Sequence, residues 1–344
     1  MAYTVHDTPA LVARVETDLA AAVRIVRAGD PALRSLVLTG AFARGEGAVL
    51  DGQPQNDYDL VALRGIGPAR VSYRRMRLTL EDRLRMHVDL APVGVARLRF
   101  VSRSIFWYET RARGRVLWGD NLLGRIRVRT PSQLDRREGL RLLVNRAAGL
   151  LIAAEEGHPH DLQIQSSKAL LAALDAHLLA LGRFAPSQTE RWAIYNGLVA
   201  DGAAPAALVP FGDALRWAYV RKVDPAQARI ADPWAAWRSA RAAVLDAVPA
   251  ALRHAGLPTL DAYGRRDGLA ERLWYMWRAP LVPGAHRMAP HPTGQIRVAT
   301  LKLLRAARDG KIPAAEAHKL LREVAAPGAR PIRTLEALRH ATLQ

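Results

Sequence analysis

The sequence predicts an α+β protein in which a small mixed sheet is followed by an all-helical C-terminal region. In the first 120 residues, short apolar runs of strand length alternate with segments of helical periodicity, a pattern typical of a sheet packed against helices. Beyond residue 120, only the helical periodicity continues. The chain has 344 residues, more than the roughly 150 expected of one domain. We therefore predict two domains, over residues 1–122 and 123–344.

The helices and strands of the first domain can be assigned in chain order. A first helix ends near Gly29, and its apolar side chains recur at helical spacing. Strands are predicted over 35–39, 58–63 and 86–92, where apolar residues dominate. A polar helix over 71–83 connects the second strand to the third.

The second domain is predicted to be helical throughout. Leucine and alanine recur at intervals of three and four residues over 140–151, 170–181 and 301–307. Two segments rich in proline and glycine, 203–212 and 280–294, interrupt this periodicity. We expect these breaks to subdivide the helical domain.

The composition favours an anionic partner and excludes thiol chemistry. The formal net charge is +18, and there is no cysteine. A disulfide scaffold, a thiol nucleophile and a thiolate metal site are therefore excluded. Residues 1–120 carry 18 basic and 13 acidic residues (+5), and the remainder carries 32 and 19 (+13). Because arginine-rich compositions also follow from GC-rich codon usage, the charge alone does not indicate nucleic-acid binding.

The sequence predicts a soluble, cytoplasmic protein. Charged residues such as Asp7, Arg14 and Glu16 interrupt the apolar runs near the N-terminus, so no signal peptide is predicted. No apolar stretch approaches the ~20 residues that a membrane helix requires.

A glycine turn followed by three carboxylates is the most informative pattern. Gly40-Ala41 directly follows the first strand, and such a turn presents backbone N–H groups that suit a phosphate chain. Asp57 and Asp59 are two residues apart at the start of the next strand, so both point to one face. Asp89 interrupts a third apolar strand. Carboxylates beside a phosphate-binding turn predict a site for two Mg²⁺ ions that act in phosphoryl transfer.

These residues resemble the core pattern of the DNA polymerase β-like nucleotidyltransferase superfamily, and the run 42–46 resembles the branch containing the aminoglycoside adenylyltransferases. The resemblance covers about residues 33–120. It implies transfer of a nucleoside monophosphate from an NTP, with ATP the expected donor, to a hydroxyl group with release of pyrophosphate. It also implies that Asp57 and Asp59 bind metal. Asp89 would be a third ligand or the general base.

Two positions depart from the family pattern. Ala41 stands where the family usually has serine or glycine, so a hydroxyl that would contact the triphosphate is missing. The segment 42–56 is also somewhat long. Neither departure removes a carboxylate, and we expect an active enzyme.

Further residues are candidates for nucleotide contacts. Arg44 either pairs with the triphosphate or is an ordinary exposed arginine, and the sequence favours neither. In the families that this chain resembles, a helical-domain lysine commonly reaches the phosphates. Lys168 is the candidate for that role, on the polar face of a helix with Asp175, and Lys311 is a rival. Glu46 is interpreted as structural, compensating the positive end of a helix.

Other conspicuous residues are given no role in a site. Trp107, Tyr108 and the run 274–278 are interpreted as core aromatics rather than base-stacking residues. His286 and His291 have no neighbouring residues that would complete a metal site.

The acceptor and the oligomeric state stay open. A basic helical half favours RNA or an anionic metabolite over a cationic antibiotic. One alternative is a toxin-like nucleotidyltransferase that modifies tRNA or protein. Another is a non-catalytic nucleotide sensor or partner-binding module, for which Ala41 would be the first sign of lost activity.

Overall fold

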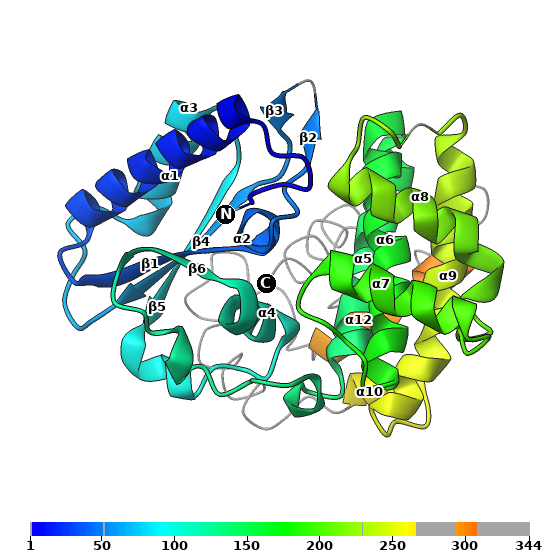
Figure 1. The fold of residues 1–344 in the computed structure, drawn as a ribbon. Coiled ribbons are helices and arrows are strands. Elements are labelled where there is room, and N and C mark those ends of the chain that lie inside the picture. Colours follow the sequence, from blue (N-terminus) through cyan, green and yellow to red (C-terminus); the bar gives the residue numbers. More distant parts are fainter. Residues whose placement is uncertain (1, 51, 229, 266–292, 308–344) are drawn as a thin grey trace, which may run out of the picture. The chain divides into compact units, whose positions relative to one another are not determined.

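The computed structural model describes residues 2–50, 52–228, 230–265 and 293–307, which belong to two compact units (Figure 1). The first unit comprises the described parts of Met1–Asp135, Gly182–Ala203 and Tyr219–Arg229. The second comprises those of Arg136–Leu181, Ala204–Ala218 and Ile230–Gln344. The fold class is α+β, as predicted, with a small mixed sheet in the N-terminal part and a helical C-terminal region.

The first unit is built on a four-stranded sheet of order β5-β4-β1-β6. Its strands are β1 (Leu33–Thr39), β4 (Tyr58–Arg64), β5 (Val88–Gly94) and β6 (Arg115–Gly119). Strand β1 pairs antiparallel with β4 and with β6, whereas β4 and β5 are parallel. The sheet is therefore mixed.

Successive side chains of the strands point to opposite faces of the sheet, so the core of this unit consists of two layers. Leu36, Leu38 and Leu60 are buried in one cluster with α1 (Pro9–Gly29) and α3 (Tyr73–Leu84). Residues that point the opposite way, such as Val37 and Val61, are buried in a second cluster. That cluster includes residues of the 3₁₀ turns η1 (Val95–Arg99) and η2 (Leu123–Arg125). Helix α4 (Ile105–Arg113) lies on the side of the sheet away from α1 and α3 (Figure 1).

The helix starts of this unit follow the sequence signals. Thr8 caps α1 by accepting the N–H of Leu11, with proline at the first helical position. Ser72 caps α3 in the same way, through the N–H of Arg75. Helix α7 (Gln188–Ala200) begins with a capping box between Ser187 and Glu190.

The hairpin after helix α2 (Gly40–Arg44) and the last strand of the sheet were not anticipated. The segment 42–56 begins inside the five-residue helix α2 and contains a short hairpin of β2 (Val49–Leu50) with β3 (Gln53–Pro54). This hairpin accounts for the extra length of the segment. Strand β6 was also not predicted: its apolar run, Val116 to Trp118, is only three residues long, and all five residues of the strand are half-buried or exposed.

The second unit is a helical assembly. Its long helices α5 (Glu138–Glu156), α6 (Pro159–Ala180) and α9 (Pro233–His254) pack together. The indole N–H of Trp237 in α9 donates to the carbonyl of Leu150 in α5 at 2.8 Å. Within the described residues, this unit also contains η4 (Val209–Phe211), most of α8 (Gly212–Val223), α10 (Leu260–Arg265) and α12 (Thr293–Ala306). The last turn of α8 and the 3₁₀ turn η3 (Pro131–Gln133) belong to the first unit.

The prediction that Asp175 lies on a polar face of its helix is wrong. Helix α6 packs against both α5 and α9, so Asp175 is buried while Lys168 is exposed. Burial lowers the pKa of Arg146 in α5, and the nearby Asp175 carboxylate raises it. The aspartate is thus beside a cation inside the helical unit.

Some predictions concern residues outside those that the structure describes. These are Lys311, His286, His291, the aromatic run 274–278 and most of the break at 280–294. Among the helices that are described, none combines the length and apolar character needed to cross a membrane.

Candidate metal and phosphate site

The turn after β1 brings the backbone of Gly40 against a carboxylate. Helix α2 begins at Gly40 itself, whose φ is +67°. A Cβ atom added there would lie 1.8 Å from Oδ2 of Asp59. The Thr39 hydroxyl also donates to the carbonyl of Asp59, at 3.2 Å. Glycine is therefore required at this position both by its conformation and by the approach of Asp59.

Asp59 lies between the other carboxylates and the turn. In the sheet, Asp59 of β4 is the register partner of Thr39 in β1 on one side and of Asp89 in β5 on the other. The pKa of Asp59 is raised to about 6, first by burial and then by the charges of Asp89 and Asp57. The negative charges of Asp89 and Asp57 thus disfavour ionisation of Asp59, and Asp89 is its direct neighbour in the sheet.

The structure places Asp57 and Asp89 in a cluster with His87. One ligand atom from each of these side chains lies within 4.8 Å of the other two. Asp57 directly precedes β4 and His87 directly precedes β5. Since the two strands are parallel, their starts meet at one edge of the sheet. All three side chains are exposed.

His87 was not singled out from the sequence. Its Nε2 atom lies 3.4 Å from Oδ1 of Asp89, and its Nδ1 atom lies 2.6 Å from Oε1 of Glu81 in α3. Glu81 in turn pairs with Arg77 at 2.9 Å. A signal was present: His87 and Asp89 alternate in one strand segment, which predicts that both point to the same face.

Arg44 is held by two glutamates. Its guanidinium donates to Glu46 at 3.0 Å and to Glu109 at 2.8 Å. Glu109 also pairs with the buried Arg191. The charge of Arg44 is nevertheless close enough to lower the pKa of Asp59. Its pairing with a triphosphate stays a prediction.

Glu46 is buried and connects this arginine to helix α7. Its carboxylate accepts the backbone N–H of Thr189, in the first turn of α7, at 2.6 Å. Burial raises the pKa of Glu46, but Arg44 and the backbone N–H groups of Thr189 and Gln188 outweigh it and lower the pKa. Glu46 therefore stabilises the positive end of a helix that follows it in the chain by more than 140 residues.

Lys222 is a second residue that the sequence did not indicate. It lies in the last turn of α8, within the first unit, and its charge lowers the pKa of Asp59. Lys168, the residue expected to reach the phosphates, is an exposed residue of α6 in the second unit. Ala41 is buried, and its role in a phosphate turn stays a prediction.

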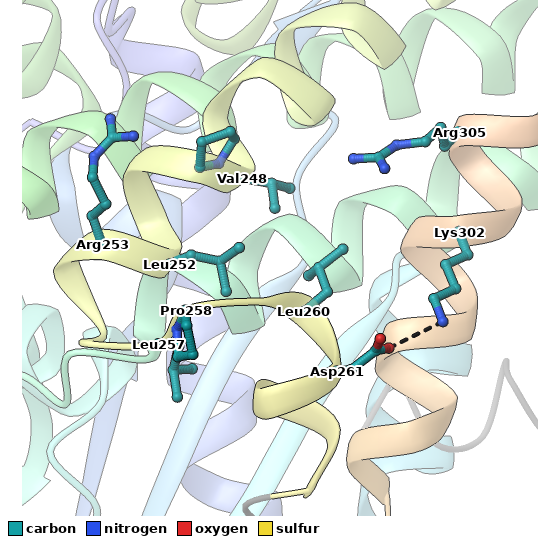
Figure 2. A pocket seen from close by; sticks show the side chains of 10 residues that line it. Val248, Leu252, Arg253, Leu257, Pro258, Leu260, Asp261, Lys302 and Arg305 are labelled. Carbon is teal, nitrogen blue, oxygen red and sulfur yellow. Dashed lines mark ion pairs between the residues drawn. The ribbon is translucent and has the colours of Figure 1, made fainter.

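The second unit contains a separate cavity of about 400 Å³. Figure 2 shows apolar side chains of α9 and of the segment that follows it, with Lys302 and Asp261 paired at 3.0 Å on one side. Arg253 and Arg305 also line the cavity. None of the carboxylates of the first unit contributes to it.

Comparisons with known proteins find limited similarity. No family model matches the sequence. No curated protein matches it. A crystal structure of a toxin–antitoxin with AMP-PNP is 21% identical over 31% of this chain and 74% of its own, with a TM-score of 0.23. A mutant of the toxin–antitoxin MntA-HpeT is 17% identical over 30% of this chain and 74% of its own, also with a TM-score of 0.23. Overlaps of this extent do not assign a function.

Proposed function

We propose that this chain is a divalent-metal-dependent nucleotidyltransferase, which moves a nucleoside monophosphate from an NTP to a hydroxyl group and releases pyrophosphate. One observation carries the proposal: Asp57, Asp59 and Asp89 gather at the start of two parallel strands, beside the glycine turn that ends β1. Three carboxylates at such a turn suit a cation and a phosphate chain together.

The negative charges of these three carboxylates favour the binding of a cation. The raised pKa of Asp59, caused by burial and by its two acidic neighbours, means that ionising all three carboxylates costs free energy in the absence of a counter-charge. Their oxygen atoms are the ligands that Mg²⁺ prefers. A bound Mg²⁺ would supply stabilisation of the charge that develops on the transferred phosphoryl group.

Two groups of the first unit are suited to the phosphates. The turn at Gly40-Ala41 begins helix α2, whose first N–H groups have no partner within the helix. The ammonium of Lys222 acts on Asp59 electrostatically, so it lies in the field of the cluster. We assign Lys222 to the phosphates because its charge acts on Asp59, and the role expected of Lys168 stays a prediction.

The acceptor proton would go to Asp89. In the proposed step the acceptor oxygen forms a bond to the α-phosphorus, the bond from that phosphorus to the pyrophosphate oxygen breaks, and a carboxylate takes the hydroxyl proton. The side chain of Asp89 is 65% exposed. It is therefore reachable by a hydroxyl of an incoming acceptor, whereas Asp59 is half-buried.

The test is a comparison of two labelled nucleotides. The full-length protein is incubated with cell extract and either α-labelled or γ-labelled ATP, in the presence of Mg²⁺. We expect the α-label alone to reach an acceptor, with release of pyrophosphate. Ribonuclease and protease treatment of the product then separates an RNA, a protein and a small-molecule acceptor, and repetition with the other three NTPs gives the base preference.

The same experiment distinguishes the two alternatives. Label on tRNA or on protein would place the chain with toxin-like nucleotidyltransferases. NTP binding without transfer of label to any acceptor would favour a nucleotide sensor, for which Ala41 in place of serine is the supporting observation. We expect transfer, and an RNA or anionic acceptor, because residues beyond 120 carry 32 basic and 19 acidic side chains.

A further inference from the structure

We propose that His87 is a metal ligand together with Asp57 and Asp89, and that this nitrogen ligand makes the site prefer Mn²⁺ to Mg²⁺. This inference rests on the proposed function only where it assigns the bound ion a role in nucleotidyl transfer. The binding of the ion is a separate property of these three side chains.

The three ligand atoms are close enough to hold one ion. Atoms that are each about 2.1 Å from a common ion lie roughly 3–4 Å apart. The ligand atoms of Asp57, His87 and Asp89 are within 4.8 Å of one another. Small rotations of exposed side chains close the remaining gap, since none of the three is packed in the core.

The backbone fixes the position of His87 relative to Asp57. The N–H of Tyr58 donates to the carbonyl of His87 at 3.2 Å, which joins the starts of the two parallel strands. Asp57 is the residue directly before Tyr58, and Asp89 is two residues beyond His87. All the proposed ligands therefore come from the first residues of one hydrogen-bonded strand pair.

Glu81 orients the imidazole ring toward the cluster. Its Oε1 atom is 2.6 Å from Nδ1 of His87. A carboxylate at this distance favours the proton on Nδ1, which leaves the lone pair of Nε2 on the side of Asp89, 3.4 Å away. Metal-binding histidines commonly have a carboxylate at the second ring nitrogen, where it sets the tautomer and raises the basicity of the ligand.

The nitrogen ligand changes which ion is favoured. Mg²⁺ prefers oxygen ligands and gives up its water reluctantly. Mn²⁺ accepts the same carboxylates and, as a first-row transition-metal ion, also coordinates nitrogen ligands such as imidazole. Asp57 and Asp89 alone would not separate the two ions, so the preference would come from His87.

Direct spectroscopy on Mn²⁺ tests this inference without any nucleotide. The full-length protein is titrated with substoichiometric Mn²⁺, and the loss of the free-ion EPR signal gives the affinity. Pulsed EPR on the bound ion then detects a directly coordinated ¹⁴N nucleus. We expect that nitrogen signal in the unmodified protein, and Mg²⁺ should compete only at concentrations at least tenfold above those of Mn²⁺.

Two variants and one control assign the signal. His87→Gln should abolish the nitrogen signal and weaken Mn²⁺ binding by tenfold or more, with less than a twofold change for Mg²⁺. Glu81→Gln, a positioning variant, should weaken Mn²⁺ binding less and keep the nitrogen signal. His6→Gln is the matched control, because His6 is exposed, in the same unit, and beside an aspartate, Asp224.

The outcomes separate this inference from the proposed function. Bound Mn²⁺ without a nitrogen signal in the unmodified protein would overturn the role of His87, and so would an unchanged Mn²⁺ affinity in folded His87→Gln. Nucleotidyl transfer would then still stand if Mg²⁺ supports it. Conversely, Mn²⁺ bound through His87 in a protein that transfers no label would confirm the inference and overturn the proposed function.

Discussion

The backbone of Gly40 and the carboxylate of Asp59 are in such close contact that one added carbon at Gly40 would lie 1.8 Å from Oδ2. The contact follows from the antiparallel pairing of β1 with β4, which places the end of the first strand beside the start of the second. The turn proposed for the phosphates and a carboxylate proposed for the cation are thereby held against each other.

Gly40→Ala should disrupt the site more than it disrupts the fold. The added methyl group must displace Asp59, so we expect at least a hundredfold loss of nucleotidyl transfer. Gly52→Ala is the matched control: Gly52 also has a positive φ, +72°, but nothing lies within 4 Å of its Cβ position. In each variant, the left-handed conformation of the new alanine lowers the free energy of unfolding by about 1–2 kcal/mol. Equal transfer rates in the two variants would show that the contact with Asp59 is unimportant.

The pKa shift of Glu46 predicts a loss of stability in acid. Burial raises this pKa, but Arg44 and the N–H groups of α7 lower it further, so the folded value is below the unfolded one. The stabilisation is present above the unfolded pKa and is lost as the pH falls through the folded one. Glu46→Gln should lower the free energy of unfolding at pH 7 by about 3 kcal/mol and flatten its acid dependence. Urea unfolding across pH 3–7 measures both effects. The exposed Glu16→Gln should change neither.

Divalent cations should stabilise the protein against heat. Binding to the folded state at a hundred times the dissociation constant adds about 2.7 kcal/mol, which corresponds to several degrees in Tm. Asp57→Asn should remove most of this shift and raise the Tm of the metal-free protein slightly, because it relieves repulsion on Asp59. Asp82→Asn serves as the control, since the Asp82 side chain is 81% exposed and its contact is with Arg85. Equal metal-induced shifts in both variants would contradict a cation at this cluster.

Removing the charge of Lys222 should impair use of the nucleotide. Lys222→Met should raise the KM for ATP and lower kcat/KM by about 10–100-fold, because the ammonium no longer acts on the phosphates. Lys168→Met, which removes the same charge from the other unit, is expected to have a smaller effect. Steady-state kinetics with varied ATP separate the two residues, and a larger defect in Lys168→Met would return the phosphate role to that lysine.

The sequence predicted the parts of this structure that depend on local pattern. Strands β1, β4 and β5 contain apolar runs, and the spacing of Asp57 and Asp59 was enough to expect one shared face. Strand β6 has an apolar run of only three residues and is recognised by its pairing with β1. Asp175 could not be interpreted correctly because its burial depends on α9, which follows it by more than 50 residues.

The contacts that define the candidate site are long-range and were not readable from local pattern. Arg44 donates a hydrogen bond to Glu109, which is 65 positions further along the chain. The sequence therefore left the role of this arginine open. The alternation of His87 and Asp89 was visible, but its meaning depends on Glu81, which approaches from α3. Lys222 is one of five lysines in the chain, and only the fold distinguishes it from the others.

The most direct test of the account is transfer of α-labelled AMP by carboxylate variants of the full-length protein. Asp57→Asn and Asp59→Asn are each expected to reduce the rate at least a thousandfold while their circular dichroism stays that of the parent, and Asp82→Asn should transfer label at the parent rate. Near-parent turnover in folded Asp57→Asn or Asp59→Asn would contradict the assignment of this acidic cluster as a nucleotidyltransferase site.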